Sequence, residues 1–256
     1  MKVKVRNILL CTAAAMAVAA VGVLYSIGAR RCAAMECSGI RVTVKDSTVN
    51  RFVDGNDVKR ILASGYGDLA GLAADSIRTD RIERILEGKS VIRDCQAYFT
   101  KDGLLNIDIS QRTPVARFQT GSNGWYADAD GYVFPLQRSY TSMVPVVDGE
   151  FPVKVERGFK GMVEDKVQRE WLMRTVGMVE YMNSGGWERR ISQIHVHGNG
   201  EIRLVPAEGK ETFLLGQPVK IAEKFNRIEK YYGTIKPLKK EYREIDLRFD
   251  GQIVCR

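Results

Sequence analysis

The stretch SVIRDCQAYFTKDGLLNIDISQRTPVA, residues 90–116, decides the fold of this chain. Residues 91–99 are typical of a strand, and residues 105–109 alternate strictly between apolar and polar side chains. Between them, Lys-Asp-Gly at 101–103 provides a tight turn, because glycine adopts a positive φ without steric cost. The stretch therefore predicts a β-hairpin.

Before this hairpin, residues 39–44 alternate as a further strand, and two helices are expected between that strand and residue 90. The first helix follows Asp54, a good N-cap, and the second opens near Thr79 and stops at Gly88. Each helix has one apolar face, formed by Val58, Ile61 and Leu62 in the first and by Ile82, Ile85 and Leu86 in the second. This order predicts an α+β unit, in which two helices cover one face of a three-stranded sheet.

After Pro114 the pattern is mostly that of strands, interrupted by two amphipathic helices. The helices are expected at 163–183 and 218–232, where apolar residues recur at helical spacing. Strands are expected at 115–118, at 125–136 around the turn Asp130-Gly131, at 143–147, 191–197, 202–205 and 212–215, and at 245–249 and 252–255. We expect a mostly β domain with the two helices packed on an antiparallel sheet.

Residues 7–29 carry no charge, and this segment is long enough to cross a bilayer, which takes about 20 apolar residues as a helix. Three basic residues precede it, so residues 1–6 are expected to form a short cytoplasmic tail. A cleaved signal peptide is the alternative, although its apolar region usually has only about 7–15 residues. Residues 30–37 are expected to form a stem behind this anchor. With either an anchor or a signal peptide, the chain from residue 30 onward is expected to be exported.

The composition excludes several classes of protein. Of the 256 residues, 45% are hydrophobic and 27% are charged, which is ordinary for a globular chain and rules out disorder. The net charge of +8 falls to +5 without the three basic residues before residue 7, so no nucleic-acid partner is needed to explain it. The five cysteines give no disulfide framework. A Cys32–Cys37 bridge stays open, and Cys95 and Cys255 are interpreted as small buried apolar residues.

No catalytic or metal motif stands out. His195 and His197 share one face of a strand, but zinc takes three or four ligands and the sequence holds no further histidine. The segment DADG at 128–131 resembles part of a calcium loop, yet Tyr126 and Gln137 stand where that loop needs acidic residues, which favours a hairpin turn. A nucleophile elbow, a P-loop and a dinucleotide-binding glycine pattern are also missing. We therefore expect no enzyme, no cofactor and no metal.

The last two predicted strands, joined by Asp250-Gly251, form a hairpin at the margin of the sheet. An edge strand presents unpaired N–H and C=O groups, which a strand of a partner can complete. Alternatively, the charges of Arg248 and Asp250 prevent another strand from pairing with this edge. The residues alone leave both interpretations open.

Three motifs follow the apolar segment in a specific order: QRTPVA at 111–116, DADGYVF at 128–134 and IDLRF at 245–249. They are similar to the E-Q-R-x-P-x-A motif, the D-x-x-G-x-x-F hairpin and the V-D-L-R-Y strand of one family, with Ser110 in place of the acidic residue of the first motif. In this order, they make the chain resemble the bacterial FtsQ/DivIB family of cell-division proteins over nearly its whole length.

The resemblance implies a POTRA domain at 38–112 and a β domain at 113–256, on the periplasmic side of a single-pass anchor in the cell inner membrane. It implies a non-enzymatic divisome scaffold at the septum, which binds an FtsB/FtsL-like coiled-coil pair by strand addition at its C-terminal edge. The partner-binding residues that it implies are Arg248, Phe249, Gln252, Ile253 and Val254. Phe249 replaces the family's tyrosine, so any hydrogen bond of that phenol is lost. Two other functions stay open: a POTRA-containing outer-membrane assembly or secretion component, and an exported enzyme with an unrecognised site.

Overall fold

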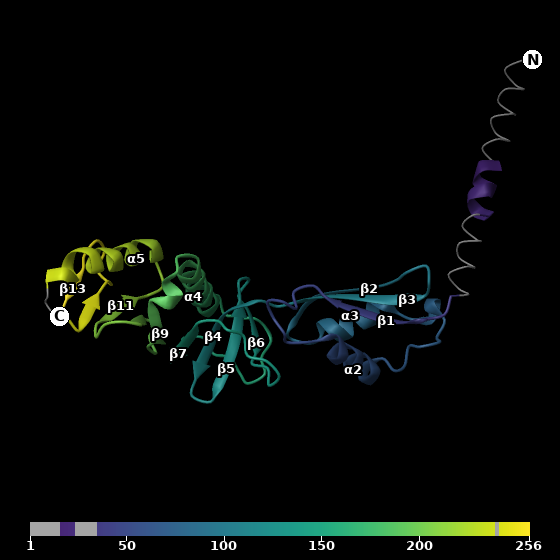
Figure 1. The fold of residues 1–256 in the computed structure, drawn as a ribbon, viewed down its shortest axis with the longest axis horizontal. Helices are drawn as coiled ribbons and strands as arrows, with labels where there is room; N and C mark the ends of the chain where they lie inside the picture. The colour runs from purple at the N-terminus through teal and green to yellow at the C-terminus, as the bar shows by residue number, and fades with distance from the viewer. Residues whose placement is uncertain (1–15, 24–34, 239–240) are drawn as a thin grey trace, which may run out of the picture. The chain divides into compact units, whose positions relative to one another are not determined.

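The computed structural model describes residues 16–23, 35–238 and 241–256. They divide into two compact units, whose helices and strands are labelled in Figure 1. The first unit comprises the described residues up to Ser47 together with Val53–Gln111, and the second comprises Thr48–Phe52 and Arg112–Arg256. The segment Thr48–Phe52 therefore belongs with a part of the chain that is distant from it in sequence.

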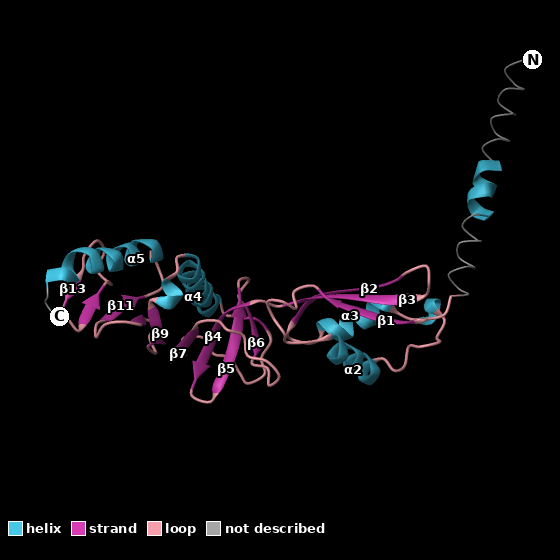
Figure 2. Cartoon of the chain, viewed as in Figure 1, coloured by secondary structure: helices cyan, strands magenta, loops and turns pink. Residues whose placement is uncertain are grey.

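The first unit is a three-stranded sheet with two helices. The strands are β1 (Gly39–Val44), β2 (Ile92–Phe99) and β3 (Leu104–Gln111), in the order β1-β3-β2, with β1 parallel and β2 antiparallel to β3. The helices are α2 (Gly55–Gly65) and α3 (Thr79–Glu87), and a 3-10 turn, η1 (Ala74–Ser76), precedes α3. Both helices lie on one side of the sheet (Figure 2). The α+β prediction is confirmed for this unit.

Local sequence explains where α2 begins and how β2 turns into β3. The Asp54 carboxylate accepts hydrogen bonds from the N–H groups of Asn56 and Asp57, both at 2.8 Å, and the Asp57 carboxylate accepts one from the Asp54 N–H at 3.1 Å. This capping box satisfies N–H groups that have no partner within the helix. Gly103 has a φ of 78°, and a Cβ there would collide with the carbonyl oxygen of Glu36, so the turn requires glycine. The core of the unit contains Val58, Leu62, Ile82, Leu86, Leu105, Ile107 and Ile109.

Within the described residues, the second unit is built on a ten-stranded sheet with the order β13-β12-β11-β10-β9-β7-β4-β5-β6-β8. Its strands are β4 (Pro114–Thr120), β5 (Asn123–Asp128), β6 (Tyr132–Pro135), β7 (Val146–Gly149), β8 (Gly161–Met162), β9 (Ile191–Val196), β10 (Ile202–Pro206), β11 (Thr212–Gly216), β12 (Glu244–Asp246) and β13 (Val254–Cys255).

The described sheet is mixed: six of its neighbouring pairs are antiparallel, as expected, but β4–β7, β7–β9 and β11–β12 are parallel pairs, so the expectation of a purely antiparallel sheet is wrong. For β7–β9 and β11–β12, the reason is that the chain passes through a helix before it returns to the sheet. The helix α4 (Lys166–Ser184) lies between β7 and β9, and α5 (Ile221–Lys230) lies between β11 and β12. A connection through a helix allows the next strand to run parallel, which a tight hairpin does not.

Both helices of the second unit pack with the sheet in one hydrophobic core. The Asp165 carboxylate caps α4 by accepting a hydrogen bond from the Gln168 N–H at 2.8 Å. Short turns extend the two helices: η2 (Trp187–Arg189) follows α4, while the π turn η3 (Tyr231–Ile235) and the 3-10 turn η4 (Lys236–Leu238) follow α5. The shared core includes Trp171, Leu172, Val176 and Val179 of α4, Phe225 and Ile228 of α5, and Val196 and Phe213 of the sheet.

The predicted membrane segment, 7–29, falls mostly outside the described residues, as do the tail at 1–6 and most of the stem at 30–37. Residues 16–23 are helical. Across the described part of the chain, no helix combines the length and the apolar character needed to span a membrane. Cys32 is not among the described residues, so the structure does not test a Cys32–Cys37 bridge. Among the described residues, Cys37, Cys95 and Cys255 form no disulfide with one another; Cys37 and Cys95 are buried and Cys255 is half-buried.

Candidate protein-interaction site

One margin of the ten-stranded sheet is open. In the described structure β13 pairs only with β12, where Ile245 faces Cys255 and the next pair, Glu244 and Arg256, exchanges both backbone hydrogen bonds at 2.9 and 3.1 Å. Hydrogen-bonded and non-hydrogen-bonded pairs alternate along antiparallel strands, so the N–H and C=O of Cys255 point away from β12. Among the described residues, no group pairs with them.

The two strands at this margin are shorter than the sequence pattern predicts. β12 ends at Asp246, because the N–H of Arg248 donates to the Asp246 carboxylate at 3.1 Å and leaves the ladder. β13 has only two residues, since the N–H of Gln252 donates within a turn to the carbonyl oxygen of Phe249 at 3.3 Å. Of the five predicted partner-binding residues, only Val254 is in a strand, while Arg248, Phe249, Gln252 and Ile253 lie in the connection between β12 and β13.

Arg248 is bound to the sheet rather than free. Its guanidinium donates to the two carboxylate oxygens of Asp246 at 3.0 and 2.8 Å and to Glu201 at 3.3 Å. The Asp246 side chain is fully buried, and its hydrogen bond with Arg248 lowers the pKa of this carboxyl below the ordinary value. The main role of Arg248 is therefore to neutralise a buried carboxylate and to fix the start of the turn.

Basic residues of α5 and its N-cap hold the turn between β12 and β13. The Arg227 guanidinium donates to the carbonyl oxygens of Phe249 and Gln252 at 2.6 and 2.7 Å. The ammonium group of Lys220, the N-cap residue, donates to the Asp250 carboxylate at 2.6 Å. The sequence reading missed both residues. Their seven-residue spacing, about two helical turns, is the signal that could have found them.

Lys224 lies on the same helix and is only 4% exposed. Its ammonium group donates to the carbonyl oxygens of Leu215 and Gln217, both at 2.8 Å, where β11 ends. Burial lowers the pKa of Lys224, and the nearby charge of Arg227 acts in the same direction. Because β11 pairs with β12, this contact helps to hold β11 in place beside the two strands of the open margin.

The margin offers apolar side chains as well as backbone groups. Phe249 is 49% exposed, and Ile253 and Val254 are half-buried. Ile253 and Cys255 pack against the core, whereas Val254 lies beside Asp246 in the register of the two strands. A strand added next to β13 would meet the free backbone groups of Cys255, with the ring of Phe249 exposed on the adjoining turn.

The two histidines are engaged with their neighbours on the sheet surface. Nδ1 of His195 lies 2.7 Å from the Asp148 carboxylate, and the rings of His195 and His197 meet edge to face with their centroids 5.0 Å apart. Groups of three or more side chains able to hold a metal ion are absent from the described residues.

The segment 128–131 is a hairpin turn, as the sequence predicted. The Asp128 carboxylate accepts hydrogen bonds from the N–H groups of Asp130 and Tyr132 at 3.1 and 2.8 Å and from the Arg112 guanidinium at 2.8 Å. Arg112 also lies over the ring of Tyr132, 3.4 Å from its centroid. Two of the quoted motifs, one holding Arg112 and the other Asp128, are thus in direct contact.

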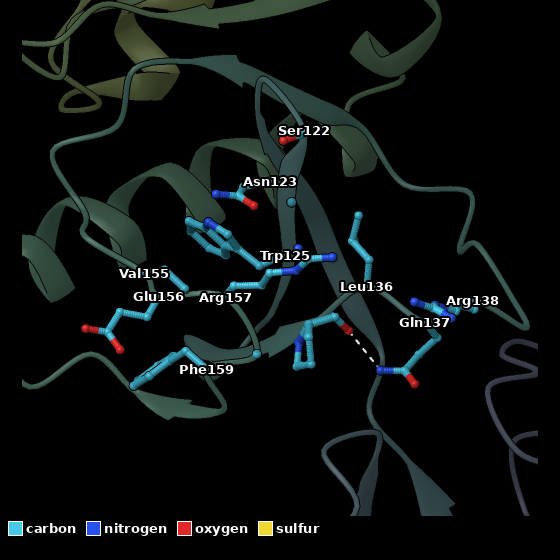
Figure 3. A pocket seen from close by; sticks show the side chains of 13 residues that line it. Ser122, Asn123, Trp125, Leu136, Gln137, Arg138, Val155, Glu156, Arg157 and Phe159 are labelled. Carbon is cyan, nitrogen blue, oxygen red and sulfur yellow. Dashed lines mark hydrogen bonds between the residues drawn. The ribbon is translucent and has the colours of Figure 1, made fainter.

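A cavity of about 230 Å³ lies between β5, β6 and the loop before β8 (Figure 3). Trp125 and Phe159 contribute apolar walls, and Arg157 is a charged group of the lining. The Gln137 amide in this lining donates to the carbonyl oxygen of Pro135 at 2.9 Å. Within the described structure, no hydrogen bond joins the Ser122 hydroxyl at this cavity to a carboxylate or an imidazole.

Each of the two units matches a known family. The POTRA-like domain family matches residues 35–110, and the family described as "FtsQ/DivIB, C-terminal related" matches residues 113–256, more than half of the chain. A search of the curated proteins found no match. Both matching families are generally non-catalytic. The chain belongs to the FtsQ/DivIB family.

Proposed function

We propose that the chain is a non-enzymatic scaffold of the bacterial divisome, anchored in the cell inner membrane by residues 7–29. Residues 1–6 would lie in the cytoplasm, and both folded units would lie in the periplasm at the septum. Membership of the FtsQ/DivIB family supports a cell-division scaffold. The absence of charge over residues 7–29 supports the anchor.

The partner of the scaffold is an FtsB/FtsL-like coiled-coil pair, bound by strand addition beside β13. The open backbone margin at Cys255 carries this proposal, because it can accept a strand without breaking a bond of the sheet. Phe249 and Val254 contribute exposed apolar surface, Gln252 and Ile253 lead the backbone into the margin, and Arg248 fixes the turn.

Two variants test the strand addition in the full-length chain purified in detergent, with capture of an FtsB-like partner as the readout. Phe249→Lys adds a charge to the exposed ring position and is expected to weaken capture at least tenfold. Met143→Lys, at a residue that is 99% exposed in another loop, is the matched control and leaves capture unchanged. Undiminished capture by Phe249→Lys would remove Phe249 from the contact surface.

The second variant, Cys255→Pro, removes an N–H that has no partner within the described sheet and places a ring in the path of an incoming strand. We expect it to abolish capture, whereas Cys255→Ala retains it. Equal capture by the two variants would argue against pairing along β13.

Localisation separates this function from that of an outer-membrane assembly or secretion component. A fluorescent fusion is expected to gather at midcell and to fractionate with the inner membrane. An even distribution around the cell, or recovery with the outer membrane, would favour the alternative. A tag placed before residue 1 reports on the anchor, since it stays with the membrane fraction unless a signal peptide is cleaved.

A further inference from the structure

The cavity between β5, β6 and the loop before β8 is separate from the margin at β13. In the order of the described sheet, β5, β6 and β8 lie at one end and β13 lies at the other. The cavity volume of about 230 Å³ is smaller than the roughly 300–1,000 Å³ of a pocket that encloses a whole small-molecule ligand. The space therefore has the size of one bulky side chain rather than of a cofactor.

The apolar walls of this cavity are held in place by packing. The Trp125 ring is stacked on Phe118, with the ring centroids 4.1 Å apart, and it meets Phe151 edge to face at 6.0 Å. Leu136, which also lines the cavity, lies so close to Gly124 that a Cβ there would come within 2.7 Å of a Leu136 methyl group. Walls that are already ordered lose little conformational freedom when a side chain binds between them.

A tight turn presents Arg157 at the cavity. The N–H of Phe159 donates to the carbonyl oxygen of Glu156 at 3.1 Å, and Gly158 has a φ of 84°, as the third residue of several turn types requires. The Phe159 side chain packs against the hydrophobic core and anchors the turn. Figure 3 shows the Arg157 side chain extending towards Leu136, whereas the Glu156 carboxylate points the other way. The fold therefore holds a cation at this cavity.

Two basic side chains of the lining have no acidic partner. Arg138 follows β6, Arg157 lies in the turn before β8, and both residues are exposed. Within the part of the chain that the structure describes, neither guanidinium forms an ion pair. Because Glu156 is the acidic residue of the lining, an excess of positive charge remains. Guanidinium groups bind carboxylates through parallel N–H donors, so the lining favours an occupant that carries acidic groups beside an apolar one.

We propose that this cavity anchors a segment of a partner polypeptide in which one bulky apolar residue is flanked by acidic residues. The apolar side chain enters between Trp125 and Leu136, and the flanking carboxylates pair with Arg138 and Arg157. A free molecule small enough to fit would bind weakly, because the gain in free energy is bounded for each ligand atom. A polypeptide also uses the charged rim, which favours it as the occupant. This surface does not depend on the proposed coiled-coil partner.

Fluorine NMR of the full-length chain in detergent, labelled with 5-fluorotryptophan, tests the proposal. The chain has three tryptophans, and Trp125 is the one in the lining, so Trp125→Phe assigns its signal. Trp187, which is buried against Phe225, is the internal reference. The probe is a capped nine-residue peptide with one phenylalanine between two glutamates on either side, in a context of glycine and serine. One control peptide has alanine in place of phenylalanine, and another has lysine in place of glutamate.

We expect the probe to shift the Trp125 signal in a saturable way and to leave the Trp187 signal unchanged. The alanine peptide should bind at least tenfold more weakly, and the lysine peptide should cause no shift. Equal binding of the alanine peptide, or equal shifts of the two signals, would overturn the proposal. A Trp125 shift that appears without peptide and grows with chain concentration would also overturn it, in favour of a second copy of this chain.

Matched variants test the charges of the rim. Arg157→Glu alters an exposed side chain, and is expected to weaken binding of the glutamate peptide at least fivefold and to favour the lysine peptide. Lys154→Glu makes the same change of charge at an exposed position that does not line the cavity, and should weaken binding less than twofold. Equal effects of the two variants would contradict the proposal. Cys255→Pro should leave this binding unaffected, and a loss of binding there would mean that the peptide binds at the β13 margin instead.

Discussion

Arg248 and Asp246 form a two-bond ion pair, with N···O distances of 3.0 and 2.8 Å, in which the carboxylate is fully buried. The guanidinium is therefore committed to the chain's own sheet before a partner arrives. Phe249, the next residue, has its side chain half exposed and free to contact a partner. We therefore expect variants to separate the two neighbouring residues: a change at Arg248 should act through stability, and, on the proposed function, a change at Phe249 should act through binding.

Arg248→Ala is expected to lower the free energy of unfolding by about 2 kcal/mol at neutral pH, because it leaves a buried carboxylate without its charged donor. The pKa of Asp246 is lowered in the folded chain, so the stabilisation is fully present above its ordinary value of 3.8 and is lost as the pH falls through the folded value. The difference between parent and variant should therefore narrow below pH 3.8. Urea unfolding across this range measures it, with Arg248→Lys as a control that keeps one charged donor. A difference that stays constant down to the lowest pH would show that Asp246 is not the group involved.

Lys224→Met is expected to destabilise the second unit by about 2 kcal/mol at neutral pH, because the carbonyl oxygens of Leu215 and Gln217 lose their donor. Burial lowers the pKa of Lys224, so between its folded value and the ordinary 10.5 the unfolded chain binds more protons than the folded chain. The stability of the parent chain then rises with pH, and its free energy of unfolding should increase relative to that of Lys224→Met as the pH approaches 10.5. Denaturant unfolding at several alkaline pH values measures this gain. Lys230→Met, at an exposed position of the same helix, should show neither effect.

Sequence periodicity predicted the strands and helices of the first unit well, because each of them is a short segment whose own pattern of apolar and polar residues matches its structure. The hairpin expected at 91–99 and 105–109 is β2 and β3, and Asp54 caps α2 as its position indicated. By contrast, no periodic pattern in the sequence predicts that Thr48–Phe52 belongs to the second unit. It depends on long-range aromatic contacts, such as that of Phe52 with Tyr126, whose ring centroids are 5.8 Å apart.

At the candidate site, periodicity predicted the location of the margin but not its geometry. Alternation through 245–249 favoured one long strand, yet Arg248 bonds to Asp246 within the turn and ends β12 early. Competition of this kind between a local side chain and the ladder is invisible to a pattern of apolar and polar residues. The parallel pairing of β11 and β12 was missed for a similar reason, since it follows from the packing of α5 against the core.

Asp128→Ala is expected to lower the free energy of unfolding by about 3 kcal/mol, because it leaves the largely buried Arg112 guanidinium without its counter-charge. It also removes the acceptor for the N–H groups of Asp130 and Tyr132, so the hairpin should loosen. Asp128→Asn keeps an acceptor oxygen and loses only the charge, so its loss of stability should be smaller. Chemical unfolding followed by the fluorescence of Trp125 on β5 measures both. Equal losses for the two variants would mean that the charge of Asp128, and not its hydrogen bonds to the hairpin, accounts for the effect.

Glu83→Ala is expected to uncover the margin of β2. The Glu83 carboxylate is the acceptor for the outward N–H of Ala97, and an edge N–H that loses its acceptor exchanges with solvent. The Ala97 amide should exchange at least tenfold faster in Glu83→Ala, whereas Glu83→Gln retains an acceptor oxygen and should change the rate by less than threefold. Amides of β3, which lies at the centre of the sheet, are the internal reference and should not change. If the Ala97 amide exchanged at the parent rate in Glu83→Ala, a group other than the Glu83 carboxylate would have to protect this margin.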